Sequence, residues 1–68
     1  MIGSDRELHV TLQRIARFQS QVEQLRSIES NPINYRLSAS GFISEIDRMN
    51  LEVREYLSVH PSELVQTV

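Results

Sequence analysis

The sequence contains no cysteine and only two histidines among its 68 residues. Without cysteine, disulfides and cysteine-based zinc sites are excluded, and His9 and His60 are too few to build a structural metal site. A chain of this length buries only about 60% of the surface that its unfolded form exposes. Small domains compensate with disulfides, a metal or association with another chain. We therefore expect no metal and no cofactor, and we expect association with another chain.

Lysine is also absent, so all seven basic residues are arginine. Arginine makes forked hydrogen bonds with carboxylates and packs its long stem, which suits helix contacts and interfaces. The net charge of −2 lacks the positive excess of a dedicated nucleic-acid binder. No apolar run approaches the roughly 18 to 20 residues of a membrane span, and the first residues do not resemble a signal peptide. We expect a cytoplasmic location and no membrane contact.

Residues 5–29 contain neither glycine nor proline, and their apolar positions recur every three or four residues. This spacing predicts one long helix. Ser4 or Asp5 is the expected N-cap, and Ser4 with Glu7 has the form of a capping box. Two consecutive steps of three break a strict heptad, which favours bundle packing over a two-stranded coiled coil. The apolar positions are Leu8, Leu12, Ile15, Phe18, Val22, Leu25 and Ile28.

A second helix is predicted over residues 38–58, where apolar residues alternate in steps of four and three. His60 and Pro61 end it, because proline cannot continue an established helix. The remaining residues, 59–68, form a tail in which "PSELV" is a candidate for one further turn. The apolar seam of this helix consists of Phe42, Ile46, Met49, Val53 and Tyr56.

Residues 30–37 are expected to form an irregular connection, because Pro32 disfavours helical geometry at the residue before it. Its apolar residues, Ile33, Tyr35 and Leu37, are expected to fold over the end of the hairpin. The alternative is that Asn31 caps the second helix with Pro32 at its first position. Both starts remain open from the sequence.

The predicted fold is an all-α, two-helix antiparallel hairpin forming a single domain. The apolar stripes are too broad for one helix–helix seam, and excess apolar surface usually marks an interface. We therefore expect a homodimer in which two hairpins form a four-helix bundle. The residues expected at the core or dimer interface are Phe18, Phe42, Ile46, Met49, Val53 and Tyr56.

The acidic residues of the second helix do not form a catalytic or metal-binding pattern. A di-metal carboxylate site needs histidine three residues after a glutamate, and none of Glu45, Glu52 and Glu55 has one. Helical pairs such as Glu45–Arg48 and Arg48–Glu52 are the expected role of these charges. Serine-nucleophile, phosphate-loop and deaminase motifs are absent. We predict no catalytic, cofactor-binding or metal-binding residue.

Two alternatives have their own sequence features. Arg14 and Arg17 share a helix face within residues 8–22, which contain no acidic residue, and could contact phosphates or an acidic protein surface. A nucleic-acid-binding helical dimer is therefore the first alternative. The segment "SEIDRMNLEV" loosely resembles the first helix of chorismate mutases, which implies a small helical enzyme as the second. The lysine that this family uses beside its arginines is missing here.

A further resemblance covers about half of the chain. The segments Asn31-Pro32, Ser40-Gly41-Phe42, residues 45–49 and Glu55-Tyr56-Leu57 are similar to short bacterial helical-hairpin proteins, some of them antitoxin-like. This resemblance implies a fold and an accessory role beside a second protein, and it transfers no site residue. The predicted function is a non-catalytic protein-interaction or oligomerisation module.

Overall fold

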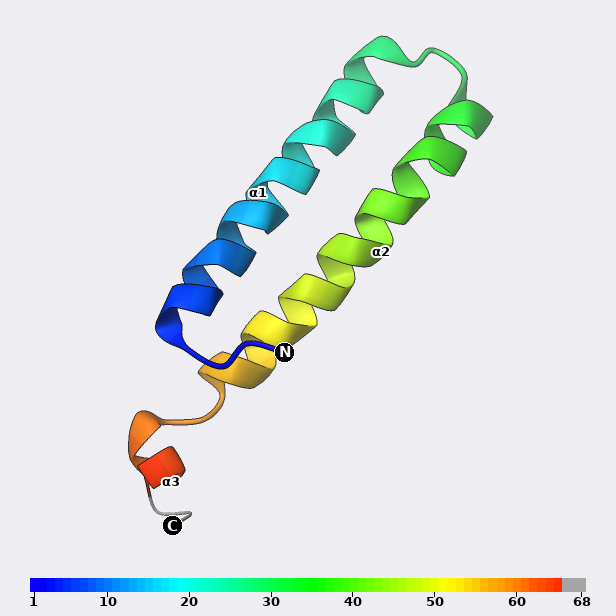
Figure 1. Ribbon diagram of the computed structural model, residues 1–68. Helices are drawn as coiled ribbons and strands as arrows, with labels where there is room; N and C mark the ends of the chain where they lie inside the picture. The colour runs from blue at the N-terminus through cyan, green and yellow to red at the C-terminus, as the bar shows by residue number, and fades with distance from the viewer. Residues whose placement is uncertain (66–68) are drawn as a thin grey trace.

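The computed structural model describes the backbone of residues 1–65 and the side chains of residues 1–63. Two long helices, α1 (Asp5–Ile28) and α2 (Pro32–Leu57), run antiparallel beside each other, and a short helix, α3 (Pro61–Val65), follows (Figure 1). The predicted all-α hairpin is confirmed. No helix of the described part is both long and apolar enough to cross a membrane.

Helix α1 begins at the predicted cap. The Ser4 hydroxyl accepts a hydrogen bond from the backbone N–H of Glu7 at 3.2 Å. The Glu7 carboxylate in turn accepts from the backbone N–H of Gly3 at 2.6 Å. A strict capping box would place this second bond on the N–H of the cap residue itself. Here it falls one residue earlier and fixes the segment that precedes the helix.

Helix α2 begins at Pro32, so the expected irregular connection over residues 30–37 and the helix start at 38 are wrong. The Asn31 side chain accepts from the backbone N–H groups of Ile33, at 2.9 Å, and Asn34, at 3.3 Å. Proline fits the first helical position because its missing N–H would have no partner there. The alternative start is the correct one, and the turn between the helices is only residues 29–31.

The early start of α2 also changes where the residues after Pro32 lie. Ile33 and Leu37 are 66% and 72% exposed, so the expectation that they cover the end of the hairpin is wrong. Tyr35 is half-buried and Ala39 is fully buried. Residues four apart share a helix face, so one face carries Ile33 and Leu37 and another carries Tyr35 and Ala39. The second of these faces packs against α1.

The core lies along the seam between α1 and α2 and is centred on Ile15, Ile46 and Met49. The rings of Phe18 and Phe42 meet edge to face, with 5.6 Å between their centroids and an interplanar angle of 82°. This geometry is favourable for aromatic pairs. Phe18, Val22 and Val53 pack against the buried cluster from its sides.

The open end of the hairpin is closed by the residues that precede α1. Ile2 is buried, at 8% exposure, and the amino group of Met1 lies 3.1 Å from Glu52 on α2. Helix α2 stops at Leu57, and α3 starts at Pro61, as the His60-Pro61 pair predicted. Of the expected tail, residues 66–68 lie outside the described residues.

Candidate interaction surfaces

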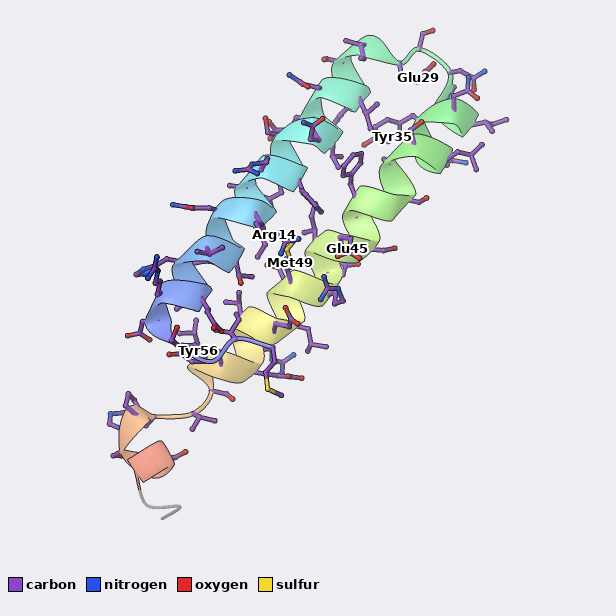
Figure 2. The ribbon with its side chains drawn as sticks, in the orientation of Figure 1. Arg14, Glu29, Tyr35, Glu45, Met49 and Tyr56 are labelled. Carbon is purple, nitrogen blue, oxygen red and sulfur yellow. The ribbon has the colours of Figure 1, made fainter. Side chains whose placement is uncertain are left out.

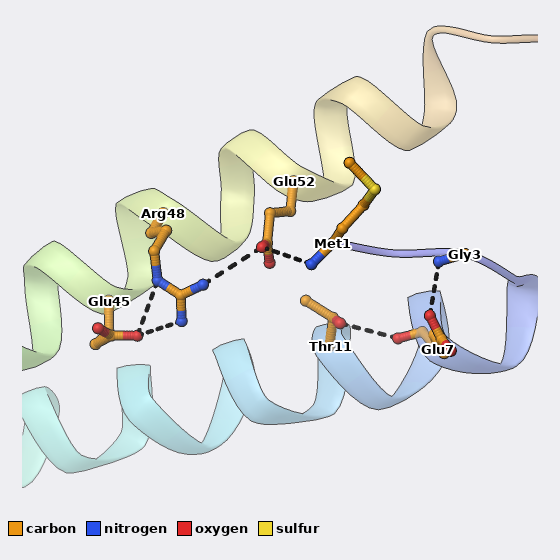
Figure 3. A network of polar contacts seen from close by, with 7 residues as sticks. All are labelled: Met1, Gly3, Glu7, Thr11, Glu45, Arg48 and Glu52. Atoms are coloured by element: carbon orange, nitrogen blue, oxygen red, sulfur yellow. Dashed lines mark hydrogen bonds and ion pairs between the residues drawn. The ribbon is translucent and has the colours of Figure 1, made fainter.

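One flank of the hairpin, which we call the charged flank, carries two groups of polar contacts (Figure 3). Arg48 lies between two glutamates of α2. Its Nη2 and Nε donate to one oxygen of Glu45, at 2.6 and 3.2 Å, and its Nη1 donates to Glu52 at 3.3 Å. Glu52 also pairs with the amino group of Met1. The two predicted helical pairs of Arg48 are therefore confirmed.

Titration in this network follows the hydrogen bonds. The bond from Arg48 lowers the pKa of Glu45 below its usual value, and the same bond raises the pKa of Arg48. The positive charge of Arg14, on α1, lowers the pKa of Glu45 a little further. Arg14 and Glu45 lie on facing helices (Figure 2). Because these side chains are in contact with water, the pairs add little stability.

A shallow hollow of about 550 Å³ lies between the helices on the charged flank. Its walls carry both signs of charge, the charged side chains being Arg6, Glu7, Arg14, Arg48 and Glu52. Arg17 is exposed and is not part of this wall. The hollow therefore does not bring the two predicted arginines together in a purely positive site.

The opposite flank is built from an uncharged series on each helix. We call it the uncharged flank. On α1 its residues follow one another by four and three positions, as do those on α2. No residue of either series carries a charge, and the next step on α1, near the turn, is Arg26. Its most exposed apolar side chains are Leu12 at 43%, Ile43 at 43% and Leu57 at 63%. The series consists of Leu8, Leu12, Ile15, Gln19 and Val22 on α1, and of Ala39, Ile43, Ile46, Asn50, Val53 and Leu57 on α2.

Helix geometry puts both series on the same side of the hairpin. Successive residues of a helix are rotated by about 100° around its axis. Leu12 and Arg14 therefore point about 160° apart, and the direction from α1 to the core lies between them. Ile43 and Glu45 are separated in the same way on α2. Since Arg14 lines one hollow with Arg48, and Arg48 bonds to Glu45, these residues mark the charged flank. Leu12 and Ile43 therefore lie together on the other one.

The residues expected at the core or dimer interface all lie along the seam of the single hairpin. Ile46 and Met49 are buried, whereas Phe18, Phe42, Val53 and Tyr56 are half-buried. They pack on or beside the other helix of the same chain, so the apolar surface left for another chain consists mainly of different residues. A helical period alone identifies a stripe, and the partner helix decides which part of that stripe stays exposed.

A third exposed apolar group lies on α2, facing away from α1. It consists of Ile33, Leu37 and Leu51, the last being 53% exposed. Charged residues such as Arg48 and Glu55 lie among or beside these positions. Scattered apolar residues among charges are common on monomeric proteins and need no partner.

The described residues contain no group of three or more histidine, aspartate or glutamate side chains that could hold a metal ion. In the comparisons with known proteins, no family model, no curated protein and no solved structure matches this chain.

Proposed function

We propose that this chain is a non-catalytic protein-interaction module that binds helices of another chain on its uncharged flank. The observation that carries the proposal is the difference between the two flanks. Glu7, Arg14, Glu45, Arg48 and Glu52 lie along one of them. The other exposes leucine, isoleucine and side-chain amides over a similar length, with charged residues along its edges.

The solvent exposure of the two flanks supports an interaction function. Both flanks of an isolated hairpin face solvent equally, so selection for solubility alone would place charges on both. Interface centres are depleted of charged residues and keep them at the rim. Amphipathic helices that bind a partner present anchors at intervals of three, four and seven residues, and Ile43, Asn50 and Leu57 follow one another at intervals of seven.

The proposed function is non-catalytic because the ionisable groups are exposed to water. The chain has no buried charged or polar residue among those whose side chains are described. Active sites typically hold such groups partly shielded from water, where their pKa values shift strongly. An accessory role beside a second protein, antitoxin-like in kind, is the form of this function that the resemblance over residues 31–57 implies.

Photo-crosslinking inside cells of the source organism tests the proposal. A photoreactive phenylalanine analogue replaces Ile43 on the uncharged flank, and a matched control replaces Ile33 on the outer side of α2. We expect adducts with another polypeptide, either a second copy or a different protein, from position 43 and not from position 33. Equal adducts from both positions, or none from position 43, contradict the proposed function.

A further inference from the structure

We propose that the uncharged flank binds the same flank of a second copy, about a two-fold axis that runs parallel to the helices. In this arrangement α1 of each copy packs against α2 of the other, and the two hairpins form a four-helix bundle. The inference rests on the proposed function and names its partner. It is carried by four charged residues at the edges of the flank.

Leu12 on α1 and Ile43 on α2 each have a pair of like charges beside them, one toward each end of the helix. Asp5 lies seven residues before Leu12, and Glu23 lies eleven residues after it. Both spacings return to nearly the same direction around the helix, within about 20°. The α1 edge of the flank therefore has an acidic residue near each end, and Arg26 continues the flank beyond Val22 toward the turn.

Helix α2 repeats this spacing with the opposite charge. Arg36 lies seven residues before Ile43, and Arg54 lies eleven residues after it. Among the residues whose side chains are described, Glu23, Arg36 and Arg54 take part in no ion pair. Within a single hairpin the α2 edge is thus basic at both ends, with Asp47 between them, and its arginines are available to another chain.

Contacts inside the hairpin give the height of each charge along the bundle. Asp5 bonds to Tyr56, and Phe18 stacks on Phe42, so the members of each pair lie at the same height. In an antiparallel hairpin, a residue of α1 and a residue of α2 at the same height therefore have numbers whose sum is about 60. Asp5 is therefore level with Arg54, and Glu23 is level with Arg36. A two-fold axis parallel to the helices preserves height. It brings Asp5 of one copy beside Arg54 of the other, and Glu23 beside Arg36, twice each.

The alternative packing is disfavoured by the same charges. A two-fold axis perpendicular to the helices would place α1 against α1 and reverse the heights. Asp5 would then face Glu23 of the second copy, and Arg36 would face Arg54. Like charges at four positions oppose that arrangement, while opposite charges at four positions favour the parallel axis.

The uncharged centre also fits a second copy. With heights preserved, Asn50 of one copy is level with Asn50 of the other, across the axis. An amide is both a donor and an acceptor, so two identical amides can bond to each other. A single polar residue of this kind within an apolar helix interface is known to fix register. The apolar layers beside it are supplied by Leu12, Ile43 and Leu57.

Charge reversal combined with sedimentation equilibrium tests this arrangement on the purified full chain. We expect the unmodified chain to dimerise, and Glu23→Arg and Arg36→Glu to weaken dimerisation about tenfold each, because each creates two like-charge contacts. Mixed in equal amounts, the two variants should form a heterodimer of nearly the original affinity, since every edge contact is then between opposite charges. Arg17→Glu is the control, because Arg17 lies outside the uncharged flank, and it should leave the affinity unchanged.

The outcomes separate this inference from the proposed function. Stronger dimerisation in either single variant would indicate the perpendicular axis and overturn the proposed arrangement. A dimer that neither variant weakens, or a chain that stays monomeric at hundreds of micromolar, would overturn it too. In these cases crosslinking from position 43 to a different protein would still support the interaction function. Only the absence of any adduct at that position contradicts both.

Discussion

The hydroxyl of Tyr56 donates a hydrogen bond of 2.6 Å to the Asp5 carboxylate, joining residues that are 51 positions apart. This contact ties the last turn of α2 to the first turn of α1, close to where Ile2 is buried. Together with the salt bridge of Met1 it closes the end of the hairpin that has no covalent turn. The same bond raises the pKa of Tyr56 above its usual value of 10.0, because the neutral hydroxyl is the donor.

We predict that the hairpin loses the stability provided by this bond as the pH becomes alkaline. Since folding raises the pKa of Tyr56, its contribution is fully present below the unfolded pKa, near 10.0, and is lost as the pH rises through the higher folded pKa. Tyr56→Phe should be less stable than the parent chain at pH 7, and the difference should vanish at the alkaline end. Urea unfolding followed by circular dichroism between pH 7 and pH 11.5 measures it. Tyr35→Phe, which lacks this partner, is the control.

We predict a large loss of stability when the centre of the seam is truncated. Met49 is 2% exposed and packs with Ile15 and Ile46, so Met49→Ala leaves a cavity that costs about 2–5 kcal/mol. Leu51→Ala, two residues away on the exposed side of α2, should change stability by less than about 0.5 kcal/mol. Denaturant unfolding of both variants makes the comparison. Equal losses would mean that α2 is rotated relative to the arrangement described.

The residues that could be predicted from sequence are those governed by local chemistry. Ser4 caps α1 because its hydroxyl can accept a hydrogen bond from a free N–H group of the first turn. The Arg48 pairs follow from helical spacing. The start of α2 was ambiguous, because Asn31-Pro32 is compatible with both a helix end and a helix start. The Asn31 side chain accepts hydrogen bonds from the next two N–H groups, so the helix starts at Pro32.

The candidate surface could not be found from the sequence. Periodicity shows that Leu12 and Ile43 each lie beside a core stripe, but not that they lie on one side of the hairpin. That conclusion needs Arg14, which lines one hollow with Arg48 and Glu52, as a marker of the other side. Burial of Ile2 was also missed. Its only local signal is an apolar residue shortly before a helix cap, which commonly contacts the first turns of the helix.

We predict that Gly41→Ala stabilises the hairpin. Gly41 lies inside α2, its backbone is not in the left-handed region, and a Cβ atom built there meets no atom within 4 Å. Alanine should therefore raise the stability by about 0.5–1 kcal/mol through the entropy of the unfolded chain and its better helix propensity. Thermal unfolding at two protein concentrations measures it. The shift should be similar at both, because Gly41 lies on the side of α2 that faces away from the uncharged flank.

We predict that Arg14 and Arg17 do not support salt-sensitive binding to nucleic acid. Arg14 shares its flank with Glu7, Glu45 and Glu52, whose negative charges oppose the approach of phosphates. Phosphate binding weakens steeply with salt, because it releases counterions from the nucleic acid. Titrations with random duplex and single-stranded oligonucleotides at 50 and 200 mM salt should show weak binding, unchanged in the Arg14→Ala, Arg17→Ala double variant. Tight binding at low salt that this double variant abolishes would contradict the prediction. It would also mean that the charged flank, rather than the uncharged one, is the functional surface, because removing two arginines leaves Leu12 and Ile43 untouched.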